Sequence, residues 1–348
     1  MGKIGLNTVT HSTMNDIARE CGISKMTVSR ALTGHPGVST PTREKILAAA
    51  QRLKYEVNTQ AQNFARKRSG FIGVATPFRG LLGSNYFSEL FEGLQIVLSD
   101  TDWDFALFDT LSSSFNDGGK LARLHRQRKV DGLLVVAPHT DDVFLETLTG
   151  LHIPLVVIGE KAHADVCSVF CNDQAGLTDL CLHLHALGHR RIAYVDGPNF
   201  LMSAKRRKQA YFEFCKKMNL RNPDWFIQRG DYTMRSGREA GLVLLKNDEP
   251  PTAIIAANDL MAYGVMESAR ELEIPIPGGI SVAGFDDLPT ASERCPSLTA
   301  IHQPVAKMGR RSAKLLLDAV VRGDLPSGHT EMEVSLVVRQ STGPPGFV

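Results

Sequence analysis

The sequence predicts a small all-α head followed by an α/β core of two lobes, each built on a doubly wound parallel sheet. Within residues 13–53, apolar residues recur at helical spacing in three short stretches. From residue 71 onward, short apolar runs alternate with amphipathic stretches, which is typical of parallel sheets covered by helices on both faces. This second part has roughly 280 residues, enough for two similar lobes.

The charge is distributed unevenly along the 348 residues. The formal net charge is +2, but residues 1–69 hold 11 Lys and Arg against 4 Asp and Glu, which leaves −5 for the remainder. A basic head on a mildly acidic body indicates that the head binds a polyanion; a solvated basic surface is the alternative. No apolar run reaches the ~18 residues of a membrane span, and the first residues lack the apolar segment of a secretory signal. We therefore expect a cytoplasmic protein.

The head is predicted to contain a helix-turn-helix. Thr13 can cap the first helix, Gly22 ends it, and Ser24 can cap the second. A third helix restarts at Thr40-Pro41, with proline at its first turn. Three short helices around one small core, the second of them basic on its outer side, are typical of this motif. Its predicted inner residues are Ile17, Ala18, Cys21, Val28, Ala31, Leu32, Ile46, Leu47, Ala50 and Leu53.

The outer side of the second helix carries the residues suited to reading DNA. In a major groove, the first residues of such a helix face base edges and its hydroxyls face phosphates. Arg30 can bind a guanine through two hydrogen bonds, whereas Met26 offers only apolar contact, for instance to a thymine methyl group. Lys25 lies beside Met26 at the same end. A helical hairpin without a role on DNA is the alternative.

The core repeats one pattern, in which a buried strand ends in a polar or bend-forming residue. The predicted strands are "FIGVATP", "DFALFDT", "DGLLVVAP", "IPLVVIG", "RIAYVDG", "TAIIAAND" and "ISVAGFDD", with a last strand-like run "MEVSLVVRQST" that returns the chain to the second lobe. Ligands of such sheets bind beyond the carboxyl ends of the strands. We therefore expect these strand ends to line a cleft: Pro77, Asp109, Pro138, Asp196, Asn258 and Asp286.

The segment "MNDIARECGISKMTVSRALTGHPGVSTPTREKILAAAQRLKYEVN" closely resembles the DNA-binding head of the LacI/GalR (lac-repressor) family of bacterial transcription regulators. Blocks such as "VDGLLVV", "LHALGHRRIAYVDGP", "SAKRRKQAYFEF" and "PSLTAIHQPVAKMG" resemble the family's periplasmic-binding-protein-like core of type I. The resemblance covers nearly all of residues 13–342. It implies a head at 1–57, a hinge at 58–69 and a core at 70–348, with lobe 1 at about 70–170 and 302–333 and lobe 2 at about 171–301 and 334–348.

The resemblance also implies which residues contact DNA. Lys25, Met26 and Arg30 fall on base-reading positions, and Thr13, Ser24, Thr27, Ser29 and Ser39 fall on phosphate-contacting positions. Asn58, Ala61 and Phe64 would form one face of a hinge helix that enters the central minor groove. Phe64 stands where the family usually has Leu, and Val57 where it usually has Pro; phenylalanine can act as a wedge between base steps. A plain linker is the alternative for this segment.

Eight residues fall on the family's effector-contacting positions: Tyr86, Phe87, Ser203, Arg207, Tyr232, Asn258, Asp286 and Gln303. Asn and Asp at strand ends also cap the helices that follow, which is the alternative for Asn258 and Asp286. The family commonly ends the strand "IPLVVIG" with Asp, whereas this chain has Gly159-Glu160. Either Glu160 substitutes for that contact or the contact is missing.

The resemblance implies a homodimeric transcription regulator, in this family most often a repressor, associated with the nucleoid. It would bind a pseudo-palindromic operator on double-stranded DNA and respond to a small-molecule effector in the interlobe cleft, a sugar or sugar derivative. We expect no enzyme activity, no cofactor and no membrane partner. Cys167 with Cys171, and His183 with His185 and His189, do not complete a metal-ligand set. A small-molecule sensor without a DNA role is the alternative function.

Overall fold

The computed structural model separates the chain into two compact units, Met1–Lys67 and Arg68–Val348, and each is described by itself. The residues that the structure describes are 12–56, 63, 68–76, 85–110, 118–138, 143–163 and 165–346.

The first unit is a three-helix head. Its helices are α1 (Met14–Cys21), α2 (Lys25–Leu32) and α3 (Thr40–Arg52). Their core contains Ile17, Cys21, Val28, Ala31, Ile46, Ala49 and Ala50. The prediction that Leu47 belongs to the buried stripe is wrong, because this side chain is 49% exposed. The stripe instead runs through Ala49, which lies three residues after Ile46 on the same helical face.

Short polar contacts fix the turn between α1 and α2. Gly22 ends α1 in the left-handed conformation at φ 69°, where glycine has no steric penalty. The Ser24 hydroxyl accepts a hydrogen bond from the Thr27 backbone N–H at 3.1 Å and so caps α2. From α3, the Lys45 ammonium donates to the Cys21 carbonyl at 2.9 Å and satisfies the end of α1. These contacts hold α2 at a fixed angle to the other two helices.

The second unit contains two sheets, each of six strands within the described residues. The first has the order β11-β5-β4-β3-β1-β2, the second the order β12-β10-β9-β8-β6-β7, and all pairings are parallel except that of β10 with β12. The first-sheet strands are β1 (Phe71–Thr76), β2 (Asp104–Asp109), β3 (Gly132–Val136), β4 (Leu155–Ile158), β5 (Ser168–Cys171) and β11 (His329–Met332). The second-sheet strands are β6 (Ile192–Asp196), β7 (Ile227–Arg229), β8 (Ala253–Ala256), β9 (Ser281–Asp286), β10 (Thr299–His302) and β12 (Ser335–Val337).

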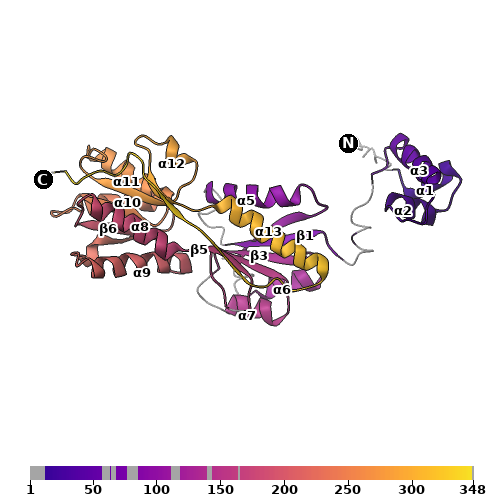
Figure 1. Ribbon diagram of the computed structural model, residues 1–348, viewed down its shortest axis with the longest axis horizontal. Coiled ribbons are helices and arrows are strands. Elements are labelled where there is room, and N and C mark those ends of the chain that lie inside the picture. The colour runs from indigo at the N-terminus through magenta and orange to yellow at the C-terminus, as the bar shows by residue number, and fades with distance from the viewer. Residues whose placement is uncertain are drawn as a thin grey trace, which may run out of the picture. The chain divides into compact units, whose positions relative to one another are not determined.

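Helices cover both faces of each sheet (Figure 1). The first lobe carries α5 (Asn85–Leu98), α6 (Gly119–Arg126), α7 (Val143–Gly150) and α13 (Val305–Arg322). The second carries α8 (Asp173–Ala186), α9 (Met202–Lys217), α10 (Met234–Leu245), α11 (Asp259–Glu271), the short α12 (Thr290–Glu293) and the 3-10 turn η1 (Asp224–Phe226). Strands buried on both faces explain why the sequence shows continuous apolar runs rather than alternation.

The chain passes between the two lobes three times within the described residues. It leaves the first sheet after β5 to form α8, returns after β10 to form α13, and passes again between β11 and β12. The three connections lie next to one another, because Cys171 pairs with Met332 and His302 pairs with Ser335. The predicted return of the last strand-like run to the second lobe is confirmed by β12.

A helical head and two parallel-sheet lobes confirm the predicted fold class. The sequence missed β5, β7, β10 and β11, which are only three or four residues long. Their sequences, SVFC, IQR, TAIH and HTEM, mix polar and apolar residues, so neither an apolar run nor an alternating pattern marks them. Among the described residues, no helix combines the length and the apolar character needed to span a bilayer.

Candidate functional site

The head presents the outer side of α2 to solvent. Lys25, Met26 and Arg30 are all exposed, and the Met26 side chain is 65% exposed although it is apolar. Neither Lys25 nor Arg30 has an ion-pair partner among the residues that the structure describes. An unpaired basic flank with an exposed methionine has the chemistry of a surface that contacts phosphates and base edges.

The predicted phosphate-contacting hydroxyls lie at helix starts and on α2. Thr13 stands before α1, Ser24 before α2 and Ser39 before α3, and all three are exposed. Backbone N–H groups and the positive end of the helix dipole favour anions at such positions. Thr27 and Ser29 lie on α2 and are half-buried. The predicted hinge residues Asn58, Ala61 and Phe64 lie outside the described residues.

The second unit contains a cavity between its two lobes. The first lobe contributes Tyr86 and Phe87 from α5, Ala137 after β3, and Gly159 and Glu160 after β4. The second contributes the remaining wall, together with Gln303 from the connection after β10: Leu201, Ser203, Arg207, Tyr232, Asn258, Leu260, Asp286 and Leu288. All eight residues that the resemblance singled out therefore line one cavity.

Arg207 is the buried cation of this cavity, with 6% of its surface exposed. Its guanidinium donates to the Asp173 carboxylate at 3.1 Å and to the Ala257 carbonyl at 2.6 Å, and it lies 3.7 Å from the centre of the Phe285 ring. The Asp286 carboxylate lies 3.8 Å away and accepts a hydrogen bond from the Gln303 amide at 2.6 Å. Packed in this way, the guanidinium is held in one orientation at the wall.

Asn258 has two roles in the structure. Its side-chain oxygen accepts the Met261 N–H at 2.9 Å and caps α11, while its amide nitrogen donates to the Tyr232 carbonyl at 3.2 Å. The capping alternative therefore holds for Asn258, although the residue also lines the cavity. Burial raises the pKa of the Tyr232 hydroxyl to about 12, against the lowering effects of Arg207 and Ser203. Within the described residues this buried hydroxyl has no hydrogen-bond partner.

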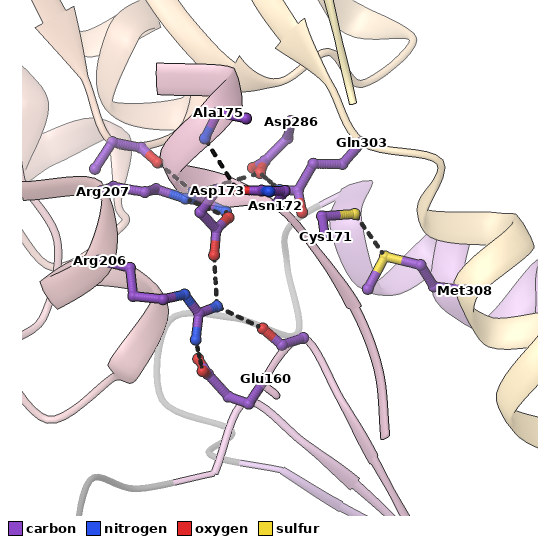
Figure 2. Close-up of polar contacts among 12 residues, drawn as sticks. Glu160, Cys171, Asn172, Asp173, Ala175, Arg206, Arg207, Asp286, Gln303 and Met308 are labelled. Atoms are coloured by element: carbon purple, nitrogen blue, oxygen red, sulfur yellow. Dashed lines mark hydrogen bonds and ion pairs between the residues drawn. The ribbon is translucent and has the colours of Figure 1, made fainter. Parts of the chain in front are cut away.

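Glu160 does not stand alone at the strand end. Arg206 binds its carboxylate, donates to the Gly159 carbonyl at 3.1 Å, and binds the Asp173 carboxylate at 2.6 Å. Figure 2 shows Arg206 between Glu160 and Asp173, with Arg207 on the other side of Asp173. The sequence left open whether Glu160 replaces a ligand contact; the structure shows that its carboxylate is bound by a protein cation.

Burial dominates the electrostatics of the cavity carboxyls. It raises the pKa of Glu160 to about 7, against the lowering effect of Arg206. It likewise raises the pKa of Asp286 to about 7, against the lowering effects of Arg207 and Gln303. Burial also raises the pKa of Asp259, next to Asn258, well above its ordinary value. For these carboxyls, the loss of hydration therefore raises the pKa by more than their partners lower it.

Several strand-end residues expected to line the cleft lie elsewhere. Asp109, Pro138 and Asp196 are not part of the cavity wall, and the Asp196 carboxylate binds the Lys208 ammonium at 2.8 Å. Pro77 lies outside the described residues. The expectation is wrong for Asp109, Pro138 and Asp196 because only some strands of each sheet end at the cleft between the lobes.

The clustered histidines His183 and His189 make structural contacts within the second lobe. His189 is fully buried and lies within hydrogen-bonding distance of the Thr252 and Ser281 hydroxyls. His183 contacts the Thr342 hydroxyl at 3.0 Å. Among the described residues, no three His, Cys, Asp or Glu side chains gather in a way that could hold a metal ion.

The sequence alone does not reveal that Arg206, Asp173 and several leucines belong to the site. Arg206 adjoins Arg207 in "SAKRR", and neighbouring arginines on a helix give no signal of which one is buried. Asp173 is the first residue of α8, where an acidic residue is expected for its effect on the helix dipole alone. Leu201, Leu260 and Leu288 line the cavity, but a sequence pattern cannot distinguish them from leucines of the hydrophobic core.

Two family models match the chain. Residues 13–58 match the model described as bacterial regulatory proteins, lacI family, and residues 181–342 match the model of a periplasmic binding protein-like domain. The first covers the head with α2, and the second covers most of the second lobe and the return through α13.

Similar proteins match over nearly the whole chain. The HTH-type transcriptional regulator reg1 of Streptomyces lividans is 30% identical over 94% of this chain and 95% of its own length. A structure of the lac repressor dimer bound to operator and the anti-inducer ONPF matches with a TM-score of 0.85 at 28% identity, over 96% of this chain and 100% of that one. The complex of the regulator CelR with cellobiose matches with a TM-score of 0.71 at 27% identity, over 95% and 100%. This chain belongs to the lacI family of bacterial transcription regulators.

Proposed function

We propose that this regulator, as a repressor, binds a pseudo-palindromic operator as a homodimer and that a small-molecule effector in the interlobe cavity controls the binding. In each subunit, Lys25, Met26 and Arg30 face base edges, and the hydroxyls of Thr13, Ser24, Thr27, Ser29 and Ser39 face phosphates. Two heads related by a two-fold axis suit half-sites on one side of the duplex. Residues 58–69, including Asn58, Ala61 and Phe64, serve as the hinge.

The observation that carries the proposal is that one chain holds an exposed basic helix flank and a buried polar cavity. The flank of α2 has no ion-pair partner among the described residues. The cavity combines aromatic side chains with Arg207 and Asp286, and such a mixture suits a ligand that has apolar faces and hydroxyl groups. The family and the CelR–cellobiose complex support a sugar or sugar derivative as the effector class.

Control follows from linkage between the cavity and the head. A ligand changes DNA affinity only if it binds the two arrangements of the lobes with different affinity. Tyr86, Phe87, Ser203, Arg207, Tyr232, Asn258, Asp286 and Gln303 line the cavity from both lobes. A ligand that contacts both walls therefore favours one separation of the lobes, and the hinge transmits this difference to the head.

The proposed role is binding rather than catalysis, and it places the protein in the cytoplasm with the chromosome. The relatives CytR and reg1 are transcriptional regulators, and the cavity carboxyls Glu160 and Asp286 are each held by a protein partner. Assays for turnover of candidate sugars should therefore show no consumption at protein concentrations that saturate operator DNA.

A gel-shift experiment tests the proposal. Duplexes selected from a random pool should be enriched in palindromes, and their retention should fall steeply with salt because phosphate contacts release counterions. Sugars are then added to the retained complex. Absence of salt-sensitive retention on any duplex would instead support a sensor without a DNA role.

A further inference from the structure

Arg206 joins the two lobes across the cleft, although its side chain is not part of the cavity wall. It belongs to α9 of the second lobe and binds Glu160 and the Gly159 carbonyl of the first lobe. The neighbouring Arg207 differs, because its partners Asp173, Ala257 and Asp286 are all in the second lobe or at its boundary. Two adjacent arginines thus have different tasks: Arg207 faces the cavity, and Arg206 faces the other lobe.

Other polar contacts also join the lobes. The Ser203 backbone N–H binds the Glu160 carboxylate, and the Asn172 amide donates to the Glu331 carboxylate at 3.1 Å. The Asn85 amide of α5 lies 3.4 Å from the Thr290 hydroxyl of α12, which is at the long end of hydrogen-bonding distances. This pair is neutral and monodentate, whereas Arg206 makes charged contacts in both lobes. Charge-assisted hydrogen bonds are roughly twice as strong as neutral ones. Arg206 therefore contributes a cation to the connection between the lobes, which the neutral donors Asn85, Asn172 and Ser203 do not.

Closure places two carboxylates near each other in a dry environment. Glu160 is 4% exposed and Asp173 is 3% exposed, and the Arg206 guanidinium binds both. Asp173 retains Arg207 as a second partner. Glu160 has Arg206 as its ion-pair partner, so removal of Arg206 leaves a buried carboxylate without a cation, the most costly way to break a buried pair.

The other carboxylates near Arg206 and Glu160 already have partners of their own. Asp286 is bound by Gln303 and lies near Arg207, and Asp287 pairs with Arg339 at 2.6 Å. Asp196 pairs with Lys208. The raised pKa of Glu160, which burial causes, agrees with a carboxylate that closure removes from water. Without Arg206, the closed form must keep an unpaired Glu160 charge or bind a proton, whereas an open form solvates the carboxylate. Opening is therefore favoured at alkaline pH.

We propose that Arg206 is a positioning residue that sets the open–closed equilibrium of the cleft, by neutralising from the second lobe the Glu160 carboxylate that closure buries. The proposal rests on the proposed function, since it concerns the movement through which an effector acts. Both Glu160 and Arg206 would then take part in regulation without contacting DNA. Arg206 would do so without contacting the effector either.

Spin labels on the two lobes measure the equilibrium directly. They are attached to Glu146→Cys and Lys246→Cys, both exposed positions, in a Cys295→Ser background because Cys295 is the exposed native thiol. At alkaline pH, where Glu160 is ionised, Arg206→Met should add a longer interlobe distance to the distribution. Glu160→Gln in the Arg206→Met background should remove that component again, because no unpaired carboxylate is left to bury. Arg206→Lys, which keeps the charge, should give an intermediate distribution.

The matched control is Lys205→Met, which removes a cation from the adjacent exposed position of α9 and should leave the distances unchanged. An unchanged distribution in Arg206→Met would overturn the proposal. So would a failure of Glu160→Gln to restore the short distance, since a general disturbance of α9 is not repaired by a change in the other lobe. Operator retention by gel shift is measured on the same samples. Loss of retention in the labelled parent would count against the proposed function, whereas unchanged distances with normal retention would count against Arg206 alone.

Discussion

Arg30 lies exposed in the last turn of α2, so its substitution changes the surface of the head without changing its core. Arg30→Ala should weaken specific operator binding by about 1–3 kcal/mol and relax the preference at one base pair. Gel shifts with a set of single-base operator variants measure both effects. Arg221→Ala, an exposed arginine of the second lobe paired with Glu249, should bind like the wild type. Weaker binding with an unchanged base preference would show that Arg30 contacts phosphate rather than a base.

Arg207 is the residue on which the effector response should depend. Arg207→Ala removes the guanidinium from the cavity and leaves Asp173 and Asp286 without it, so sugars that alter operator retention by the wild type should no longer do so. Operator binding without sugar should persist, because the head folds around its own core. Breaking a buried pair costs on the order of 3–5 kcal/mol, so thermal unfolding must be recorded as well. Arg238→Ala, an exposed pair with Glu271, is the control; a normal response of Arg207→Ala would exclude the residue from the site.

At this scale the family resemblance identified eight residues of the cavity wall, whereas the strand-end pattern also pointed to Asp109, Pro138 and Asp196, which are not part of it. Strand-end residues such as Asn258 and Asp286 can be placed because parallel strands bring their carboxyl ends to one edge. Partners such as Arg206 for Glu160 cannot, because they come from different lobes and depend on how the lobes meet. The contact of Met26 or Arg30 with a base stays a prediction.

At the scale of the element, the packing of α10 against α11 depends on glycine. A Cβ atom at Gly264 would lie 2.1 Å from the Met234 carbonyl oxygen, a backbone atom that cannot move away. Gly264→Ala should therefore lower the free energy of unfolding by about 1–3 kcal/mol or more. Gly150→Ala is the matched control, because nothing lies within 4 Å of the added methyl group. Denaturant unfolding followed by circular dichroism distinguishes them, and equal midpoints would show that the two helices can separate without cost.

Element boundaries were predictable where a run of apolar residues is long. The strand β9 and the helix α5 follow from their patterns, whereas β7, with the sequence IQR, is an edge strand that gains its structure only by pairing with β6. In the head, the misplacement of Leu47 reflects the same limit. Three neighbouring apolar or small residues on a short helix leave its buried face ambiguous until the other helices are in place.

For the whole molecule, the raised pKa of Glu160 links stability to pH. The pKa of Glu160 is about 7 in the fold, whereas the ordinary value for a glutamate is about 4.5. The fold therefore binds more protons than the unfolded chain between these two values. The stability from this group is complete below about pH 4.5 and is lost as the pH rises through about 7. Between pH 5 and 8, the free energy of unfolding of the wild type should therefore fall by on the order of 1–3 kcal/mol relative to that of Glu160→Gln.

The measurement is the thermal unfolding midpoint of both proteins across this pH range. Using the difference between the two removes the contributions of other groups, such as His183 and His189, whose pKa values are lowered by burial. Glu146→Gln, an exposed carboxyl of the first lobe, should follow the wild type. A difference curve that is flat, or that rises in the opposite direction, would show that Glu160 is solvated in the native protein.

The three adjacent connections between the lobes limit which relative movement of the lobes a ligand can favour. A single tether lets two bodies swivel about any axis, whereas three tethers side by side permit chiefly a bend about the line along which they lie. Cys171 beside Met332 and His302 beside Ser335 mark that line. Small molecules of different shape would thus act on the same bending movement, and they would differ in which arrangement of the lobes they favour and in how strongly they favour it. Substitutions in the cavity wall can therefore change which compound binds without changing the axis about which the lobes bend.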